Sequence, residues 1–257
     1  MNQQPYYNDE TVTIYNGESL EIIPNVGTIG ALITDPPYSS GGAFRSDRTR
    51  TTVEKYVSTG TAAYRPDFAG DNRDQRSFLF WSTMWLNAAY QIANPGAPIA
   101  CFIDWRMLPT LTDAIQAAGW VWRGVAVWDK GFGRPTPGRF SNAAEYIVWG
   151  SKGVMPHRNA YPPGVFRSSA PKEREHITQK PEAVMEWILN IVPEGATILD
   201  PFMGSGTTLH VAKQTGRSAI GIETDPYFCE IAAKRCAATL PITRPATDTA
   251  QQELFGL

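Results

Sequence analysis

The sequence is poor in cysteine and histidine and has no long apolar run. Its three cysteines, Cys101, Cys229 and Cys236, fit neither a disulfide framework nor the ligand spacing of a zinc site. No apolar stretch is long enough to span a bilayer, and we expect no signal peptide. These absences predict a soluble protein of a reducing compartment, the cytoplasm, with the three thiols buried in its core and no bound metal.

The sequence also lacks an excess of charge of either sign. Its 23 lysines and arginines are balanced by 25 aspartates and glutamates, which gives a formal net charge of −2. This balance excludes nucleic-acid binding through bulk charge and leaves only local basic patches for that purpose. A chain of 257 residues, 42% of them hydrophobic, can bury a full core, so we expect one α/β domain with insertions.

The motif Asp35-Pro36-Pro37-Tyr38 follows an apolar run that is typical of a buried parallel strand. In open α/β sheets, ligands bind just outside the carboxyl ends of such strands. The two prolines fix φ, remove two N–H donors and hold the preceding residue extended. The motif therefore offers two acceptors, the Asp35 carboxylate and the Pro36 carbonyl, beside the ring of Tyr38. This arrangement suits a planar amine, and the alternative is a strand followed by a proline-rich turn.

A second motif has the form of a strand, a glycine-rich turn, a helix and another strand. The first strand, over residues 197–200, ends in Asp200, and the turn over residues 201–208 opens a helix. Glycines at such a turn let a ligand approach the backbone and the helix N-terminus. The second strand, over residues 218–222, ends in Glu223, where an acid commonly accepts hydrogen bonds from ribose hydroxyls. We predict an adenosine-bearing cofactor here; the alternative is a bare structural turn.

The remaining elements follow from hydrophobic periodicity. We expect further strands over residues 12–16, 98–103, 120–128 and 145–149, and helices over residues 75–94, 108–118, 182–191 and 226–239, with a brief helix after residue 17. The strands over 120–128 and 145–149 should form a hairpin around a basic loop. The apolar face of the helix over residues 75–94 reads as core, and we predict no function for it.

Together these motifs resemble those of the AdoMet-dependent DNA amino-methyltransferases. In that family an Asp-Pro-Pro-Tyr motif holds the base and a Phe-x-Gly-x-Gly loop holds the cofactor, and a catalytic motif that precedes the cofactor motif resembles the beta class. Three further segments match: His176–Pro181 resembles His-x-Thr-Gln-Lys-Pro, Gly17–Leu20 resembles Gly-Asp-x-Leu with Glu18 in place of Asp, and Trp128–Glu145 resembles a Trp-x-Lys … Glu segment near the target base. The resemblance spans about residues 12–239. It implies a Rossmann-like AdoMet-dependent methyltransferase fold, with a mostly parallel central sheet, helices on both faces and permuted motif order.

The resemblance also implies roles for individual residues. The catalytic residues are Asp35, Pro36, Pro37 and Tyr38. The cofactor, S-adenosylmethionine, is held by Glu18, Thr178, Lys180, Asp200, Pro201, Phe202, Gly204, Ser205, Gly206, Thr207 and Glu223. Within this set Glu18 faces the adenine, Glu223 the ribose, and Asp200 with Thr178 or Lys180 the methionyl end. No metal is needed, because the methyl group of the cofactor is already activated.

The implied reaction is methylation of the N6 amine of a flipped-out adenine in double-stranded DNA. Aspartate at the first motif position is typical of adenine-N6 enzymes and serine of cytosine-N4 enzymes, and a cytosine-N4 methyltransferase is the alternative. Three other classes fit less well. A catalytically silent AdoMet-dependent DNA-binding protein conflicts with the intact motif, and protein-glutamine methyltransferases have Asn in place of Asp35. An NAD dehydrogenase needs a hydride-transfer site that this motif does not supply.

Two aperiodic stretches carry many basic residues. We predict that residues 39–76 form a lid that orders on the substrate and contacts DNA, and that residues 151–175 form a compact target-recognition segment. A solvated flap and a plain connecting loop are the respective alternatives. The candidate DNA contacts from these stretches and from the hairpin loop are Arg45, Arg48, Arg50, Lys130, Arg134, Arg139, Arg158 and Arg167.

We therefore expect one catalytic domain over residues 1–240 and a flexible tail over residues 241–257. In the tail, Gln251, Leu254 and Phe255 resemble the Gln-x-x-Leu-Phe peptide by which bacterial DNA enzymes bind the replication sliding clamp. We hypothesise a clamp tether; the alternative is a tail that docks on its own domain. The resemblance also implies a homodimer, which would match a palindromic site, and a nucleoid-associated enzyme encoded by a bacterium or a phage.

Overall fold

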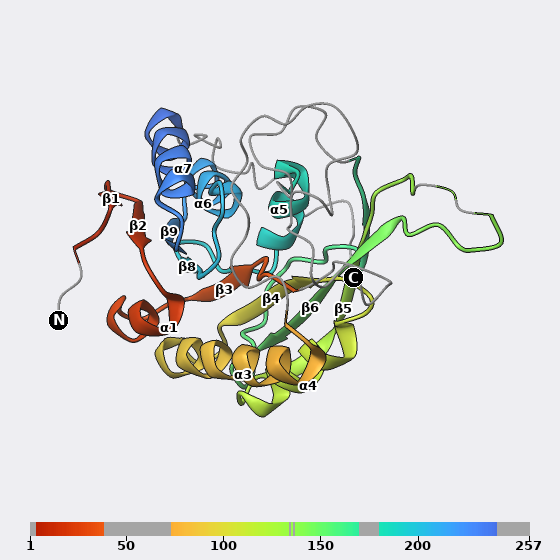
Figure 1. The fold of residues 1–257 in the computed structure, drawn as a ribbon. Coiled ribbons are helices and arrows are strands. Elements are labelled where there is room, and N and C mark those ends of the chain that lie inside the picture. The colour runs from red at the N-terminus through yellow and green to blue at the C-terminus, as the bar shows by residue number, and fades with distance from the viewer. Residues whose placement is uncertain (1–3, 39–72, 134, 136, 170–179, 241–257) are drawn as a thin grey trace, which may run out of the picture.

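A twisted sheet runs through the molecule in the computed structural model, which describes residues 4–38, 73–133, 135, 137–169 and 180–240 (Figure 1). Within these residues the sheet has nine strands in the order β1-β2-β9-β8-β3-β4-β6-β5-β7. The strands are β1 Tyr7–Asn8, β2 Val12–Asn16, β3 Ala31–Thr34, β4 Pro98–Ile103, β5 Val121–Asp129, β6 Ala144–Ser151, β7 Val165–Arg167, β8 Thr197–Asp200 and β9 Ser218–Glu223.

The centre of the sheet is parallel, and antiparallel pairs lie toward its edges. Strands β2, β9, β8, β3 and β4 pair in parallel, whereas β6 runs antiparallel to both β4 and β5. The chain leaves β3 for β4 on one side and later returns to the other side through β8. This change of direction is the topological switch point at which α/β sheets bind ligands. The site is therefore expected outside the carboxyl ends of β3 and β8.

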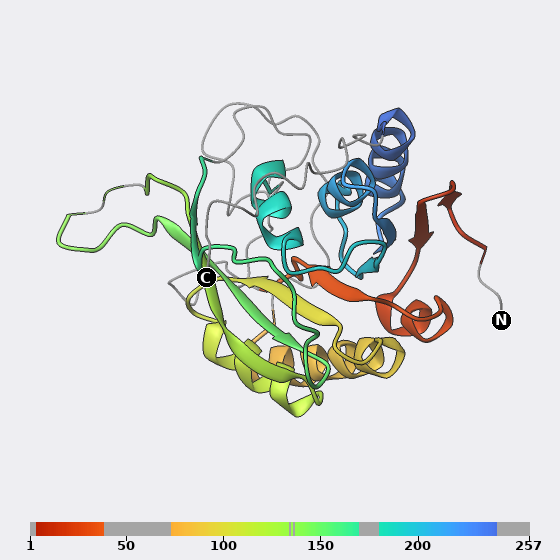
Figure 2. The ribbon, with the colours of Figure 1, turned by 180° about the vertical axis from the view of Figure 1, so that it is seen from behind.

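Helices cover both faces of the sheet, as Figures 1 and 2 show from opposite sides. One face carries α1 Ser19–Ile22, the 3-10 turn η1 Ile23–Asn25, α3 Gln75–Ile92 and α4 Leu108–Ala117, and the other carries α5 Glu182–Leu189, α6 Thr207–Gln214 and α7 Pro226–Ala238. Neighbouring side chains of a strand point to opposite faces. In β4, for example, Ala100 and Phe102 join the core under α5 to α7, whereas Ile99 and Cys101 join the core under α3 and α4. Burial on both faces explains why the strands read as continuous apolar runs.

Most predicted elements are confirmed to within one or two residues, and two strands were missed. β1 has two residues and β7 has three, too few to show a period of two. β7 pairs in parallel with β5, so residues 165–167 of the predicted recognition segment belong to the sheet. The predicted boundary of the loop over residues 39–76 was also wrong, because α3 begins at Gln75 and includes Arg76. Residues 39–72 and the tail lie outside the described part of the chain, so the lid and the clamp motif stay predictions.

The three thiols are buried, as predicted, and the described residues contain no cluster of metal ligands. Cys101, Cys229 and Cys236 each have no exposed surface and form no disulfide. Within the described ranges, no group of three or more histidine, cysteine, aspartate or glutamate side chains is placed to hold a metal ion. Among the same residues, no helix has the length and apolar character that crossing a membrane requires.

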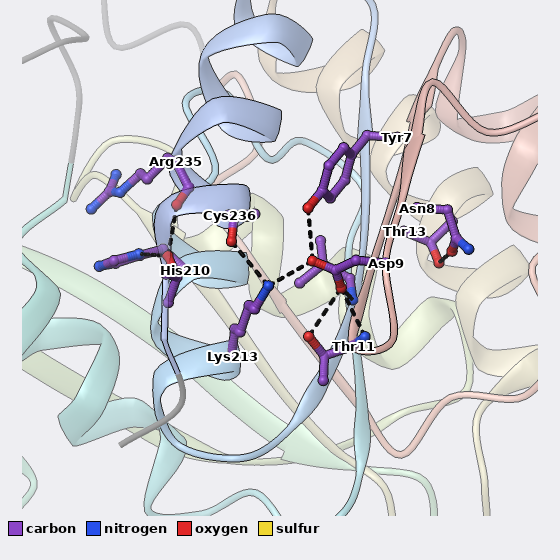
Figure 3. Close-up of polar contacts among 11 residues, drawn as sticks. Tyr7, Asn8, Asp9, Thr11, Thr13, His210, Lys213, Arg235 and Cys236 are labelled. Atoms are coloured by element: carbon purple, nitrogen blue, oxygen red, sulfur yellow. Dashed lines mark hydrogen bonds and ion pairs between the residues drawn. The ribbon is translucent and has the colours of Figure 1, made fainter. Parts of the chain in front are cut away.

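A partly buried ion pair fastens the N-terminal strands to the helical layer (Figure 3). The Asp9 carboxylate accepts hydrogen bonds from the Tyr7 hydroxyl at 2.7 Å, from the Thr11 amide at 2.8 Å and from the Lys213 ammonium of α6 at 2.6 Å. Lys213 also donates to the carbonyl of Cys236 in α7 at 3.0 Å. Burial opposes ionisation of Asp9, but these donors outweigh it and hold the pKa of Asp9 well below its usual range. Asp9 therefore stabilises the folded chain through its ionised form.

We expect Lys213→Met to lower the free energy of unfolding at pH 7 by about 1.5–3 kcal/mol, because it removes a charged hydrogen bond from a largely buried carboxylate. The matched control is Lys234→Met, which removes an exposed ion pair with Glu230 one helical turn away and should leave the free energy of unfolding nearly unchanged, because water and salt screen that pair. Urea denaturation of both variants measures the difference.

The pH dependence of this effect has a definite sign. The pKa of Asp9 is lower in the folded chain than in the unfolded one, so its stabilisation is complete above the unfolded pKa of about 3.9 and is lost as the pH falls through the folded pKa. The stability gap between wild type and Lys213→Met should therefore narrow below about pH 4. Two results would contradict the stabilising role of ionised Asp9: an equal loss of stability in Lys213→Met and Lys234→Met, or a difference between wild type and Lys213→Met that widens in acid.

Candidate active site

Two carboxylates stand at the carboxyl ends of adjacent parallel strands. Asp35 directly follows β3, and Asp200 is the last residue of β8, with which β3 pairs. The Thr34 hydroxyl donates a 2.7 Å hydrogen bond to Oδ1 of Asp200, so the backbone that carries Asp35 is fastened to the second carboxylate. The sequence predicted both positions, because each carboxylate ends an apolar run.

The Asp35 carboxylate is held by Lys180, which precedes α5. The Lys180 Nζ atom contacts Oδ2 of Asp35, lies 3.3 Å from Oε2 of Glu145 and stands 5.0 Å from the centre of the Phe102 ring. Lys130 forms the next ion pair, 2.6 Å from Oε1 of Glu145. Only 6% of the Lys180 side chain is exposed, so its charge interacts mainly with these partners rather than with water. The four groups form an alternating row, Asp35–Lys180–Glu145–Lys130.

The row contains two carboxylates and two ammonium groups, and these groups shift each other's pKa. Burial raises the pKa of Asp35, Lys180 opposes that rise, and the nearby Glu145 adds to it. The pKa of Glu145 is lowered, because Lys180 and Lys130 together outweigh its burial. The pKa of Lys180 is raised despite burial, since two carboxylates face it. The lysine is therefore charged, and its charge favours the ionised form of Asp35.

One oxygen of Asp35 has no donor. Oδ1 is buried, and no group in the described part of the chain donates a hydrogen bond to it. A buried acceptor left without a partner is costly, and such groups are often completed by a ligand. Pro36 is buried beside Asp35, and Tyr38 packs partly buried against the core under α3. The structure thus brings Asp35, Pro36 and Tyr38 together with an acceptor available for a substrate donor.

The loop after β8 has the shape that a cofactor requires. Gly204 and Gly206 adopt positive φ angles of 51° and 76°. A Cβ on Gly206 would lie 2.7 Å from that of Ala232, whereas one on Gly204 would meet no atom within 4 Å, so the backbone is open to a ligand there. Beside this opening, the Glu223 carboxylate accepts a 3.1 Å hydrogen bond from the Gly204 amide. These residues fit the predicted adenosine-bearing cofactor.

The segment after β2 contacts both the end of β9 and the loop after β8. The Gly17 amide donates to the carbonyl of Glu223 at 2.9 Å, and the Ser19 hydroxyl donates to the carbonyl of Pro201. Glu18, between them, is exposed and serves as the N-cap residue of α1 without capping it through its side chain. Glu18, Pro201 and Glu223 therefore come from three separate segments but meet at one place, as the resemblance implies for a cofactor site.

The interior of α3 supports this loop, which the sequence did not reveal. The Phe202 ring packs edge-on to Trp85 and tilted against Trp81, each at 5.1 Å between ring centres. Arg73 stacks over the outer face of Trp81 at 4.1 Å. The aromatic spacing of α3 predicted a core face, which is confirmed. The prediction missed that part of this face fixes the position of Phe202.

The remaining predicted site residues are placed as follows. Ser205 and Thr207 are buried in the loop that opens α6, and Arg235 donates to the Thr207 hydroxyl at 3.1 Å. Lys180, which the resemblance assigned to the cofactor, here contacts Asp35 and Glu145; its contact with the cofactor stays a prediction. Thr178, Arg45, Arg48, Arg50 and Arg134 lie outside the described residues.

Three predicted DNA contacts lie on and beside the hairpin. Arg139 is exposed in the loop between β5 and β6. Arg167 of β7 pairs with Asp129 at 2.8 Å and remains 75% exposed, and Arg158 donates to the carbonyl of Asn190. Lys130, in contrast, belongs to the buried row that ends at Asp35. Glu145 was placed near the target base only by resemblance, and no local pattern indicates its contact with Lys180.

Comparison with known proteins finds DNA methyltransferases similar in sequence and in fold. The family described as DNA methylase matches residues 29–163 and 157–234. The type II methyltransferase M2.LlaDCHI of Lactococcus lactis subsp. cremoris is 27% identical over 259 residues, which cover 90% of this chain and 91% of the relative. The crystal structure of the M1.HpyAVI–SAM complex is 25% identical, with a TM-score of 0.63, and covers 87% of this chain and 98% of that one. The cytosine-N4-specific PvuII DNA methyltransferase is 18% identical with a TM-score of 0.68 and covers 91% and 89%, which shows a shared fold.

We expect AdoMet binding to weaken as the pH falls through about 6. Burial raises the pKa of Asp200 to about 6, against hydrogen bonds from Thr208, Thr34 and the Phe202 amide. If Asp200 faces the ammonium group of the methionyl end, binding favours its ionised form, and affinity falls by up to about tenfold per pH unit below that pKa. Calorimetric titration with AdoMet between pH 5 and pH 8 measures this slope.

Burial also raises the pKa of Glu223, so two variants are needed to assign the pH dependence of AdoMet binding to Asp200 or to Glu223. Asp200→Asn should bind AdoMet weakly at every pH and without the slope, whereas Glu223→Gln should weaken binding but keep the slope. A slope that disappears in Glu223→Gln and persists in Asp200→Asn would reverse the two assignments.

Proposed function

The chain belongs to the N6/N4 DNA methylase family, whose members methylate DNA with AdoMet, and from this premise we propose that it methylates the N6 amine of adenine in double-stranded DNA. The observation that carries the proposal is Asp35, a buried carboxylate with one oxygen held by Lys180 and the other without a donor among the described residues. An exocyclic amine supplies the missing donor. Adenine is favoured over cytosine because aspartate opens the motif, as in the adenine-N6 enzymes that the sequence resembles.

The chemical problem is that the amine of adenine is a poor nucleophile, since its lone pair is delocalised into the ring. The Asp35 carboxylate would accept one N–H and the Pro36 carbonyl the other, which favours a pyramidal nitrogen with an available lone pair. The proton then leaves through Asp35 or water. Lys180 orients Asp35 and keeps it ionised, so that it accepts rather than donates. Tyr38 would stack on the base, which must leave the duplex to reach this position.

The cofactor, when bound, supplies a methyl group that is activated by its sulfonium. Glu223 would accept hydrogen bonds from the ribose hydroxyls at its Oε2 atom, which already accepts the Gly204 amide; the Thr224 hydroxyl and the Asp225 amide donate to Oε1 instead. Asp200 and Glu18 would face the methionyl end and the adenine. Gly204 leaves room for the backbone to approach the ligand.

The wider partners of the enzyme follow from the same proposal. The exposed Arg139 and Arg167 would contact phosphates beside the target base, with Arg158 and the arginines of the 39–76 stretch adding further contacts. A homodimer would suit a palindromic site. A tether to the sliding clamp through Gln251, Leu254 and Phe255 is a separate proposal that the catalytic geometry neither requires nor opposes.

We expect mass spectrometry of nucleosides from unmethylated DNA, incubated with the protein and AdoMet, to detect N6-methyladenine. Sequencing the modified positions would give the recognition site. Asp35→Ala should lower product formation at least about a thousandfold while AdoMet binding persists, because it removes the proposed acceptor but no cofactor contact.

Each other outcome changes a defined part of the proposal. N4-methylcytosine would keep the mechanism and overturn the base. AdoMet binding without any modified base in DNA would contradict the proposed substrate. Loss of AdoMet binding in Asp35→Ala would contradict the role given to Asp35.

A further inference from the structure

The described residues of the loop between β5 and β6, which are 130–133, 135 and 137–143, project away from the body of the molecule in both views (Figures 1 and 2). The loop carries two phenylalanines, Phe132 and Phe140, whose side chains are 76% and 104% exposed. Single apolar side chains on a surface are ordinary, so exposure alone assigns no function. Phe132 and Phe140 differ from ordinary exposed apolar side chains because their loop is connected to the residues around Asp35.

Both stems of the loop end in the row of charges that holds Asp35. Lys130 on one stem and Glu145 on the other form a 2.6 Å ion pair that closes the base of the loop. Glu145 lies 3.3 Å from Lys180, which contacts Asp35. An extended residue spans at most about 3.5 Å, so the backbone of Phe132, two residues beyond Lys130, lies within about 7 Å of the Lys130 backbone. The loop that carries the two rings therefore begins and ends at the row that holds Asp35, where we propose that the target base binds.

Contacts across the base of the loop shape it in the absence of DNA. The Lys130 amide donates to the carbonyl of Ala143 at 2.8 Å. Gly133 lies so close to Asn142 that a Cβ on it would stand 2.9 Å from the carbonyl group. A loop that is already shaped loses less conformational entropy when it binds a partner. The base of the loop is thus preformed.

We propose that this loop is a DNA-inserting arm, in which Phe132 and Phe140 occupy the stacking space that the target base leaves. The inference rests on the proposed function and adds to it the groups that keep the duplex open. Extrusion of a base exposes the faces of its neighbours, and an aromatic or apolar side chain inserted there replaces the lost stacking. Arg139, exposed beside Phe140, is placed for the adjacent phosphates. An apolar tip with a basic flank suits a DNA duplex better than an acidic or membrane partner.

The test compares the double variant Phe132→Ala/Phe140→Ala with a control variant, Trp122→Ala. The Trp122 side chain is 43% exposed and lies at the other end of β5, so the control also removes an exposed aromatic ring. Substrates are two duplexes that contain the site located by sequencing, one fully paired and one with an abasic position opposite the target base. On the paired duplex the double variant should methylate at least about tenfold more slowly under single-turnover conditions. With 2-aminopurine at the target position, it should also give a smaller fluorescence increase. On the abasic duplex its rate should return to within about twofold of wild type.

Three results would overturn the arm: equal rates for the double variant and wild type, an equal loss on both duplexes, or a loss as large in Trp122→Ala. Conversion of a dimer to a monomer in light scattering would instead assign the phenylalanines to an interface between copies of the chain. Circular dichroism and AdoMet affinity should match wild type, since both rings are exposed. Failure of wild type to methylate any DNA would contradict the proposed function, whereas differences between variants concern the arm alone.

Discussion

The ion pairs of Lys180 with Asp35 and Glu145 are the contacts on which the site depends. They bring together three parts of the chain: the tip of β3, the start of β6 and the segment before α5. Burial alone would favour a neutral Asp35, which would donate rather than accept at one of its oxygens. Lys180, whose side chain is only 6% exposed and faces two carboxylates, opposes this effect of burial and fixes the direction of the Asp35 carboxylate. Without Lys180, Asp35 would face Glu145 and lose the one cation that contacts it among the described residues.

The sheet supplies the framework in which this contact becomes useful. Because β3 lies next to β8 in the sheet, its carboxyl end stands beside the glycine loop that follows β8. Thr34 donates a hydrogen bond to Asp200, and Phe202 packs on Trp81 and Trp85, so the glycine loop after β8 and the carboxyl end of β3 share one support. A methyl donor and an amine acceptor would thus be held by neighbouring strands, which is how positioning lowers the barrier of a transfer reaction.

Much of this arrangement could be predicted from the sequence, because the signals are local. Strands buried on both faces read as apolar runs, so the ends of β3 and β8 were identified with their carboxylates. The glycine turn and Glu223 followed from the spacing of one βαβ unit. The short strands β1 and β7 gave no periodic signal. The contact of Lys180 with Asp35 joins residues 145 positions apart, and its geometry depends on packing that no local pattern encodes. The packing of α3 against Phe202 could not be predicted either, because it also joins residues that are far apart in the sequence.

The most direct test of the account is the pH dependence of methyl transfer in Lys180→Met and Lys180→Arg, measured in single turnovers with saturating AdoMet. If Lys180 favours the ionised form of Asp35, removing the charge of Lys180 raises the pKa of Asp35 further. On acidification, the variant should then lose its methyl-transfer rate at a higher pH than wild type does. The account predicts a shift of the acidic limb upward by at least about one pH unit in Lys180→Met, since an opposite charge at contact distance is worth about one to three units. Lys180→Arg, which keeps the charge, should stay close to wild type. An acidic limb that is the same in all three proteins would contradict the account.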